Sequence, residues 1–464
     1  MFIKNNNIDK ILIFFLFTHL FVWTLVPSIS NINLPLDTIE ALAWSTNIDW
    51  GYSKHPPFSA WAVGFVYKIF GNQDWAYYLL SQVFVIFSFL IVFVFSKEFF
   101  QNKIYSLISV FLLEVIYFYN FTTPEFNVNI SQLPFWALTV FFCWRGIKKN
   151  KAVDWFLFGL FAALGVLSKY LFIYLLIAID IFFIYFIFTK KFKLKFLISL
   201  LSFFLILIPH IIWLVENDYT TITYALSRTS KNEISSLNHL THPLIFLGKQ
   251  AAILLPFFIM FLFLAKNFKI KLKKIKLKTR DKKLLFLLTI NFVPIILVFF
   301  TSLILGTKIR TMWMTPFYLF FGVLFVYIFQ KKIFLKKIKT FLVIFLILFI
   351  FSPLAYSYIS ISEKNKRTDY PGKIIANKIQ QEWNNNFSNT IESVIGDEWH
   401  AGNLSYHLDS RPKWYTHSSA FIDRSMEDFV NTIGKNGFLI INGECSHGVS
   451  FIIENNKICM LGSK

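Results

Sequence analysis

Residues 155–188 read WFLFGLFAALGVLSKYLFIYLLIAIDIFFIYFIF. A single helix of this length would measure about 51 Å, at about 1.5 Å per residue, whereas the hydrocarbon core of a bilayer is about 30 Å thick. The stretch is therefore too long for one membrane crossing. A polar break at Ser168-Lys169-Tyr170 predicts that the chain turns back there, so this stretch alone indicates a polytopic α-helical membrane protein.

Similar apolar runs recur along the first 360 residues. Hydrophobic side chains make up 56% of the 464 residues, and a water-soluble domain of this composition would expose large apolar patches. The runs, of about 16 to 21 residues each, are long enough to span a bilayer. We expect about eleven spans, near residues 11–28, 76–96, 104–121, 131–146, 153–168, 171–188, 196–215, 245–265, 284–304, 312–330 and 340–360. Three cysteines exclude a disulfide scaffold, and no Cys/His cluster has the spacing of a zinc site.

The net charge of +20 indicates how the chain is oriented in the membrane. If the N-terminus lies inside, the inner segments hold 27 basic and four acidic residues, whereas the charges of the outer loops cancel. An excess of Lys and Arg on the cytoplasmic side is the usual pattern. No small-x-small cleavage site follows the first span, so we interpret it as a retained anchor. The basic charge is therefore a topology signal, and nothing in it indicates nucleic-acid binding.

The tail at 361–464 has a different composition and predicts a small soluble α/β domain. An odd number of spans places it outside the membrane, on the side opposite the N-terminus. Residues 438–442 and 449–453 are typical of strands, and residues 374–383 of a helix. Cys445 and Cys459 either form a disulfide in this oxidising compartment or remain two free thiols. We expect residues 1–360 to form the membrane domain.

The outer loop at about 29–75 holds the groups that are most suited to chemistry. Asp37 and Glu40 are three residues apart, so on a helix they share one face. The Lys-His-Pro-Pro sequence at 54–57 follows, and its two prolines would fix the backbone around the cation and the imidazole. Such a group can act as a base or bind a metal. An interfacial amphipathic helix with a solvated acidic face remains the alternative.

The segment from Asp37 to Trp61 resembles the first periplasmic loop of glycosyltransferases that use lipid-linked sugars. These enzymes form the protein O-mannosyltransferase-like superfamily with the C-type fold, and the resemblance is strongest to the branch of the lipid A galacturonic acid and aminoarabinose transferases. It covers roughly residues 9 to 330. Further segments that carry it are Thr123-Pro124-Glu125, Pro134 to Leu138, Leu167-Ser168-Lys169-Tyr170, Trp213 with Asn217 and Arg228, Lys308 to Trp313, and Pro316 with Tyr318.

The resemblance assigns catalytic roles to three carboxylates, with two departures from the family pattern. Asp37 corresponds to the family's catalytic Asp, but Thr38 follows it where the branch usually has Glu. Glu40 is therefore a candidate substitute for the missing neighbour. Glu125 stands where relatives tend to carry Asp, which keeps the carboxylate but extends its reach by one methylene. As a general base, Asp37 would take a proton from an acceptor hydroxyl during an inverting attack, and it would orient an acceptor that is already ionised.

The resemblance also implies the substrates. The chain would transfer one sugar from polyprenyl (undecaprenyl) phosphate to lipid A or to the lipopolysaccharide core, at the periplasmic face of a bacterial inner membrane. The phosphate leaves with growing negative charge, which cations stabilise in the transition state. The residues assigned to substrate binding are Lys54, His55, Lys169, Tyr170, Arg228, Lys308 and Arg310.

Several alternatives to these assignments stay open. Lys169 between two spans is either a phosphate ligand or a lysine that snorkels to the interface. Lys308 and Arg310 are phosphate contacts or ordinary loop charges. His55 with Asp37 and Glu40 suits a divalent metal such as zinc or manganese, although the spacing matches no metal motif. A transporter or flippase of lipid-linked sugars is the alternative function, but no inverted repeat is visible.

Overall fold

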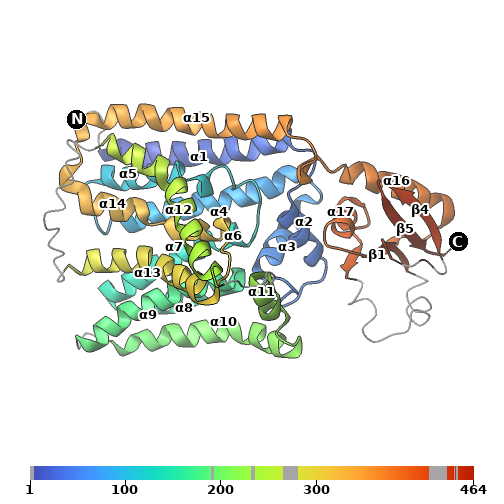
Figure 1. The fold of residues 1–464 in the computed structure, drawn as a ribbon, viewed down its shortest axis with the longest axis horizontal. Coiled ribbons are helices and arrows are strands. Elements are labelled where there is room, and N and C mark those ends of the chain that lie inside the picture. Colours follow the sequence, from blue (N-terminus) through green and yellow to red (C-terminus); the bar gives the residue numbers. More distant parts are fainter. Residues whose placement is uncertain are drawn as a thin grey trace.

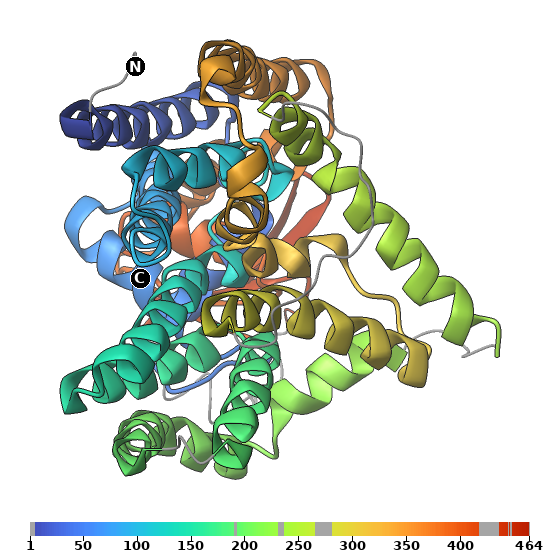
Figure 2. The same ribbon diagram turned by 90° about the vertical axis from the view of Figure 1, so that its left-hand side faces the viewer.

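The computed structural model describes residues 5–189, 193–230, 236–264, 281–416, 436–443, 445 and 448–463. Most of these residues form helices that lie along one long axis, with a small sheet at one end (Figure 1). Viewed from the opposite end, most of the helices point toward the reader and form a bundle (Figure 2). The expected fold class, a polytopic helical protein with a C-terminal sheet, is therefore confirmed.

Six helices in the described part are long and apolar enough to cross a membrane, judged by length and composition. A seventh candidate is a helix pair bent by 51°, formed by η4 (Thr311–Tyr318) and α14 (Phe321–Phe329) with its continuation. The six are α1 (Asn5–Ser30), α4 (Asp74–Ser96), α10 (Leu197–Glu216), α12 (Asn238–Leu262), α13 (Lys282–Leu305) and α15 (Ile338–Ser362).

Helices also occupy the remaining expected spans, but they are shorter. These are α5 (Lys103–Glu114) with η1 (Tyr117–Tyr119), α7 (Leu133–Lys149), α8 (Ala152–Ser168) and α9 (Ile173–Phe188). The count of eleven crossings therefore stays a prediction.

The apolar stretch at 155–188 folds back as its sequence predicts. Helix α8 ends at Ser168, Lys169 has an extended backbone with φ −164°, and the turn η2 (Tyr170–Phe172) leads into α9. The ring of Phe172 packs against Gly165, where an added Cβ would lie 2.3 Å from a ring carbon. The close approach of this ring requires the glycine, so sequence and packing agree on the position of the turn.

The loop at 29–75 is more structured than its sequence indicates. It contains α2 (Leu36–Trp44) and α3 (Phe58–Phe70), and both lie between the bundle and the C-terminal domain in Figure 1. Pro57 precedes α3, and Gly71, with φ 64°, ends it. Two further short helices belong to the described structure, α6 (Val128–Ser131) and α11 (Thr220–Ser230).

The C-terminal domain combines a five-stranded sheet with two helices, α16 (Gly372–Asn386) and α17 (His400–His407). The strand order is β2-β1-β3-β5-β4; β1 pairs in parallel with β2 and β3, whereas β5 is antiparallel to β3 and β4. The strands are β1 (Ile391–Ile395), β2 (Lys413–Tyr415), β3 (Gly437–Ile441), β4 (Val449–Ile453) and β5 (Asn456–Leu461). Cys445 and Cys459 form a disulfide, which resolves the alternative left open by the sequence.

This domain docks directly onto α2. Gly402 of α17 packs so closely that an added Cβ would lie 3.2 Å from side-chain carbons of Ile39 and Ala43. Arg411 donates a hydrogen bond of 2.6 Å to the carbonyl oxygen of Leu42. Helix α2 is thus held between the C-terminal domain and the bundle, and any side chain on α2 is positioned by both.

Candidate active site

Asp37 lies in the first turn of α2 and meets the loop that follows η1. The backbone N–H of Asp37 donates to the Glu125 carboxyl, with a distance of 3.0 Å to Oε1. One residue further, the hydroxyl of Thr38 donates to the carbonyl of Phe126 at 3.1 Å. These two bonds bring together carboxyl groups that are 88 residues apart in the chain. The sequence assigned catalytic roles to both groups, and the structure places them side by side.

The surroundings of Asp37 and Glu125 favour ionisation of one carboxyl group over the other. Burial raises the pKa of Glu125 to about 8, and the neighbouring Asp37 raises it further. Burial also raises the pKa of Asp37, and Lys169, Lys54, Arg310 and Arg228 offset only part of that rise. Because cations surround Asp37, Glu125 is the group that keeps the proton at neutral pH. An ionised carboxylate beside a protonated carboxyl gives one base and one hydrogen-bond donor.

Glu40 lies beside Asp37 but takes part in a different interaction. The ammonium of Lys54 is 2.9 Å from Glu40 and 3.1 Å from Glu398, so it bridges two carboxylates. Burial lowers the pKa of Lys54, but the two carboxylates outweigh burial and the pKa is raised. Glu398 comes from the C-terminal domain, and its contact with Lys54 was not predicted from the sequence.

Lys169 is the most buried cation of the site, with only 5% of the residue exposed. Its ammonium donates to the side chain of Asn129 and lies 5.2 Å from the ring centre of Trp313. Burial lowers the pKa of Lys169 to about 7, although Asp37 raises it. The ammonium points into the protein, so the snorkelling alternative is wrong. Asn129 was missed by sequence reasoning, and its position four residues after Glu125 was the signal available.

His55 is neutral and belongs to an aromatic cluster. Burial lowers the pKa of His55 to about 3, and Lys169, Lys54 and Arg228 lower it further. Its ring lies 6.0 Å from Trp44 and 6.3 Å from Tyr224, measured between ring centres.

The remaining predicted residues differ in their relation to Asp37. Arg228 stacks on Tyr224 at 5.7 Å and is exposed, as are Lys308 and Arg310. Arg310 is among the cations that lower the pKa of Asp37 most strongly, and Lys308 is not among them. The hydroxyl of Tyr170 bonds to His210 at 2.8 Å, so the structure does not bring Tyr170 into contact with Asp37.

No three His, Cys, Asp or Glu side chains gather closely enough to hold a metal ion in the described ranges. The metal site considered for His55, Asp37 and Glu40 is therefore not assembled there. Instead, His55 faces cations, and Glu40 binds an ammonium. The chemistry of the site has to be derived from carboxylates, cations and an amide.

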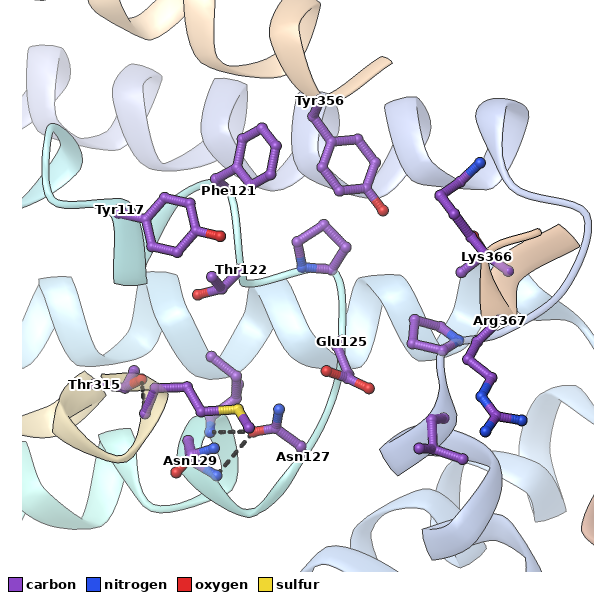
Figure 3. Close-up of a pocket in the computed structure, with 16 residues that line it drawn as sticks. Tyr117, Phe121, Thr122, Glu125, Asn127, Asn129, Thr315, Tyr356, Lys366 and Arg367 are labelled. Carbon is purple, nitrogen blue, oxygen red and sulfur yellow. Dashed lines mark hydrogen bonds between the residues drawn. The ribbon is translucent and has the colours of Figure 1, made fainter. Parts of the chain in front are cut away.

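A cavity of about 340 Å³ opens beside Glu125 (Figure 3). Figure 3 shows the carboxyl group of Glu125 among polar groups at one side of the cavity, with aromatic rings across from it. Its lining includes Glu125, Asn127, Asn129, Thr315, Tyr117, Phe121, Tyr356, Lys366, Arg367 and Thr368. A second cavity, of about 500 Å³, lies between α12 and α15 and shares Tyr117 and Phe121 with the first. The shared aromatic side chains make the two cavities neighbours, and only the first is lined by charged side chains.

Two comparisons with sequences of known proteins give matches. Residues 54–213 match a family described as dolichyl-phosphate-mannose-protein mannosyltransferase. A curated protein of Wigglesworthia glossinidia brevipalpis, undecaprenyl phosphate-alpha-4-amino-4-deoxy-L-arabinose arabinosyl transferase, is 29% identical over 151 residues. That match covers 31% of this chain and 26% of the relative, so it spans about a quarter of the relative's length.

Two similar solved structures are those of ArnT from Cupriavidus metallidurans. The form bound to undecaprenyl phosphate has a TM-score of 0.64 and 11% identity, and covers 97% of both chains. The apo form has a TM-score of 0.62 and 10% identity, and covers 97% of this chain and 98% of that one. At these identities the likeness shows the fold, and it extends over the membrane part and the C-terminal domain alike.

Proposed function

We propose that this chain, a member of the protein O-mannosyltransferase-like superfamily with the C-type fold, transfers one sugar from undecaprenyl phosphate to lipid A or the lipopolysaccharide core. The relative named above transfers a sugar from undecaprenyl phosphate, and the similar solved structure binds that lipid. The single observation that carries the proposal is the Asp37–Glu125 pair beside the buried Lys169.

The cations around Asp37 suit the leaving phosphate of the donor. Lys54, Lys169, Arg228 and Arg310 all act on the Asp37 carboxyl, so positive charge is concentrated near it, where a dianion could be held. Negative charge grows on the phosphate as the bond to the anomeric carbon breaks. Fixed cations therefore stabilise the transition state more than the bound donor. Lys308 and Tyr170 remain predictions of substrate contact.

The cavity beside Glu125 suits the acceptor. An inverting displacement needs the nucleophile and the leaving group on opposite faces of the anomeric carbon. None of the four cations that act on Asp37 lines the Glu125 cavity, although Asn129, which accepts from the Lys169 ammonium, does. We assign the cations to the donor phosphate and the cavity to the acceptor. Lys366 and Arg367 line this cavity and suit phosphate groups of the acceptor, and the neighbouring apolar cavity suits its acyl chains. Asp37 takes the proton of an acceptor hydroxyl, or orients an acceptor phosphate.

The same proposal includes the topology. The start of α1 and the C-terminal domain lie at opposite ends of the bundle (Figure 1). With the basic segments inside, the N-terminus is cytoplasmic, and the catalytic loop and the sheet domain are periplasmic. The site then lies at the periplasmic face of the inner membrane.

A deletion strain tests the function and identifies the sugar. Mass spectrometry compares lipid A and core from the parent strain, the deletion strain and the strain complemented with Asp37→Asn. We expect the deletion to remove the mass of one sugar, and wild-type protein but not Asp37→Asn to restore it. Identical lipid masses in all strains would contradict the proposal.

A further inference from the structure

A polar cluster lies inside the bundle, away from the proposed site. Nδ1 of His19, on α1, is 2.8 Å from Oε2 of Glu114, on α5, and both residues are essentially inaccessible to solvent. The other ring nitrogen of His19 lies 3.2 Å from Oε1 of Gln82, on α4. Ionisable groups in an apolar interior are costly and are retained where they have a function or a partner. His19 is the partner of Glu114 in this interior.

The cluster continues to the loop that carries Glu125. The amide nitrogen of Gln82 donates to Oγ1 of Thr123 at 3.1 Å, and the hydroxyl of Ser81 donates to the carbonyl of Thr123. Thr123 is therefore held at its side chain and at its backbone by two consecutive residues of α4. Pro124 follows with a fixed φ, and Glu125 comes next.

The direction of each hydrogen bond in this cluster can be determined by starting from Thr123. The hydroxyl of Thr123 donates its one proton to the carbonyl of Asn120 at 2.6 Å, so it must accept from Gln82. The amide nitrogen of Gln82 is then used, and its oxygen has to accept a proton from His19. His19 in turn directs its second nitrogen to Glu114. One orientation of the Gln82 amide thus fits both of its contacts, with Thr123 and with His19.

We propose that Gln82 and the His19–Glu114 pair form a positioning relay that fixes Thr123 and thereby holds Glu125 against the N-terminus of α2. The inference rests on the proposed function, in which Glu125 acts beside Asp37. Apolar side chains would pack α1, α4 and α5 equally well, but they would not specify where the Thr123 hydroxyl lies. The relay therefore fixes the orientation of the Thr123 side chain, which apolar packing would leave undefined. It affects the reaction only through the position of Glu125.

Variants at the contact between Gln82 and Thr123 test the relay. Gln82→Met keeps the length of the side chain and removes both of its hydrogen bonds, and Thr123→Val removes the hydroxyl. We expect each to lower kcat by about tenfold to a hundredfold with little change in KM, because a small displacement of a positioned group is enough for such a loss. Thr123→Ser keeps the hydroxyl and should retain activity.

The double variant separates positioning from general damage. If the two residues act through one contact, Gln82→Met combined with Thr123→Val is no slower than either single variant. Ser88→Ala is the matched control, because Ser88 is a buried polar residue of the same helix whose hydroxyl bonds only to the carbonyl of Phe84. It should behave as wild type. Losses that multiply in the double variant would overturn the relay.

The pH profile gives a readout that a loss of stability would not move. Glu125 has a pKa of about 8 because it is buried, so activity that needs its protonated form falls as the pH rises through about 8. A Glu125 displaced toward water in Gln82→Met has a lower pKa, and the fall then begins at lower pH. An unchanged profile with reduced amplitude would contradict the inference.

Hydrogen exchange tests the relay independently of turnover. The amide of Asp37 is protected by its bond to Glu125. In Gln82→Met, exchange in peptides covering residues 33–44 and 117–130 should become faster than in wild type and in Ser88→Ala. Unchanged exchange in both peptides would reject the relay. Failure of the proposed function appears instead as a wild-type protein without transfer activity, whose exchange still reports on the relay.

Discussion

At the scale of single residues, the proposed reaction depends on the different protonation states of the Asp37 and Glu125 carboxyl groups. Two carboxyl groups in contact do not both ionise, and the surrounding cations decide which of them does. Burial raises the pKa of both carboxyls, but four cations counteract it at Asp37, whereas the charges that act on Glu125 are those of Asp37 and Glu40 and raise its pKa further. Asp37 is therefore the proposed base, and Glu125 holds the first turn of α2 by accepting the backbone N–H of Asp37.

Replacing Glu125 tests which form of this group is needed. Glu125→Gln resembles the protonated carboxyl, so we expect activity within about tenfold of wild type at pH 7, whereas Glu125→Ala should lose about a hundredfold. In wild type the rate should fall as the pH rises through about 8, because Glu125 then loses its proton. This fall should be absent in Glu125→Gln, as measured by kcat between pH 6 and pH 9. A Gln variant that is inactive at every pH would contradict the assignment.

Lys169 makes donor binding dependent on pH. Burial lowers its pKa to about 7, so it is charged below that pH and largely neutral above it. Affinity for undecaprenyl phosphate should therefore be full below pH 7 and weaken as the pH rises through 7. Lys169→Arg keeps its charge throughout and should bind with a weaker pH dependence. Titration of the purified protein with undecaprenyl phosphate at pH 6 and pH 8 measures both effects.

An exposed lysine provides the control for this titration. Lys378 lies on α16 and is exposed, so Lys378→Gln should keep the wild-type pH dependence. If Lys169→Arg shows the same pH dependence as wild type, the dependence arises from another group.

At the scale of elements, α2 is the part whose position determines the site. Gly402 and Arg411 of the C-terminal domain contact the outer face of α2. The first turn of α2 is hydrogen-bonded to the loop that holds Glu125. Lys54 also joins the two parts, because it bridges Glu40 of α2 and Glu398 of the domain. The C-terminal domain is therefore expected to influence catalysis without supplying the base.

Enlarging Gly402 tests this coupling. An added side chain would meet Ile39 and Ala43 of α2, so Gly402→Val should displace α17, lower the free energy of unfolding by about 1–3 kcal/mol and reduce kcat. Gly248→Val is the matched control, since an added Cβ there has no atom within 4 Å. Thermal unfolding and transfer rates measure the two effects. Unchanged turnover in Gly402→Val would show that the docking has no part in the reaction.

Sequence reasoning predicted those elements whose signal is local. Helix α16 and strands β3 and β4 follow from the periodicity of their own residues, and the fold-back at Lys169 follows from the length of the apolar stretch. Helix α3 was missed because its 13 mostly apolar residues lie in a stretch that was interpreted as a single loop. The pairing of Lys54 with Glu398 joins residues that are 344 positions apart, and no local pattern encodes such a contact.

Only part of the candidate site was predicted, again because only local sequence patterns carry a signal. Asp37, Glu125 and Lys169 were assigned through the segments that carry the family resemblance, and the fold brings them together. Asn129 and Glu398 bind the ammonium groups of Lys169 and Lys54. The only local signal for Asn129 was its position four residues after Glu125, and Glu398 lies in a turn far from Lys54 in the sequence. Tyr170 matched a motif, yet its hydroxyl is bonded to His210.

At the scale of the whole molecule, the charge distribution predicts the orientation of the site. The start of α1 and the sheet domain lie at opposite ends of the bundle (Figure 1), so with the N-terminus inside the C-terminus should be periplasmic. Alkaline phosphatase fused after Lys464 should be active, because this reporter needs an oxidising compartment, and the same reporter fused before Met1 should be inactive. The reverse pattern would place the proposed site on the cytoplasmic face and contradict the account.

The most direct measurement is transfer by the purified protein in liposomes. These would contain an undecaprenyl phosphate-linked sugar and lipid A, and mass spectrometry would follow the products. The account predicts that wild-type protein adds the mass of one sugar to lipid A and releases undecaprenyl phosphate, and that an equally stable Asp37→Asn variant does neither. Movement of the donor across the bilayer without a covalent product, or equal transfer by Asp37→Asn, would contradict it.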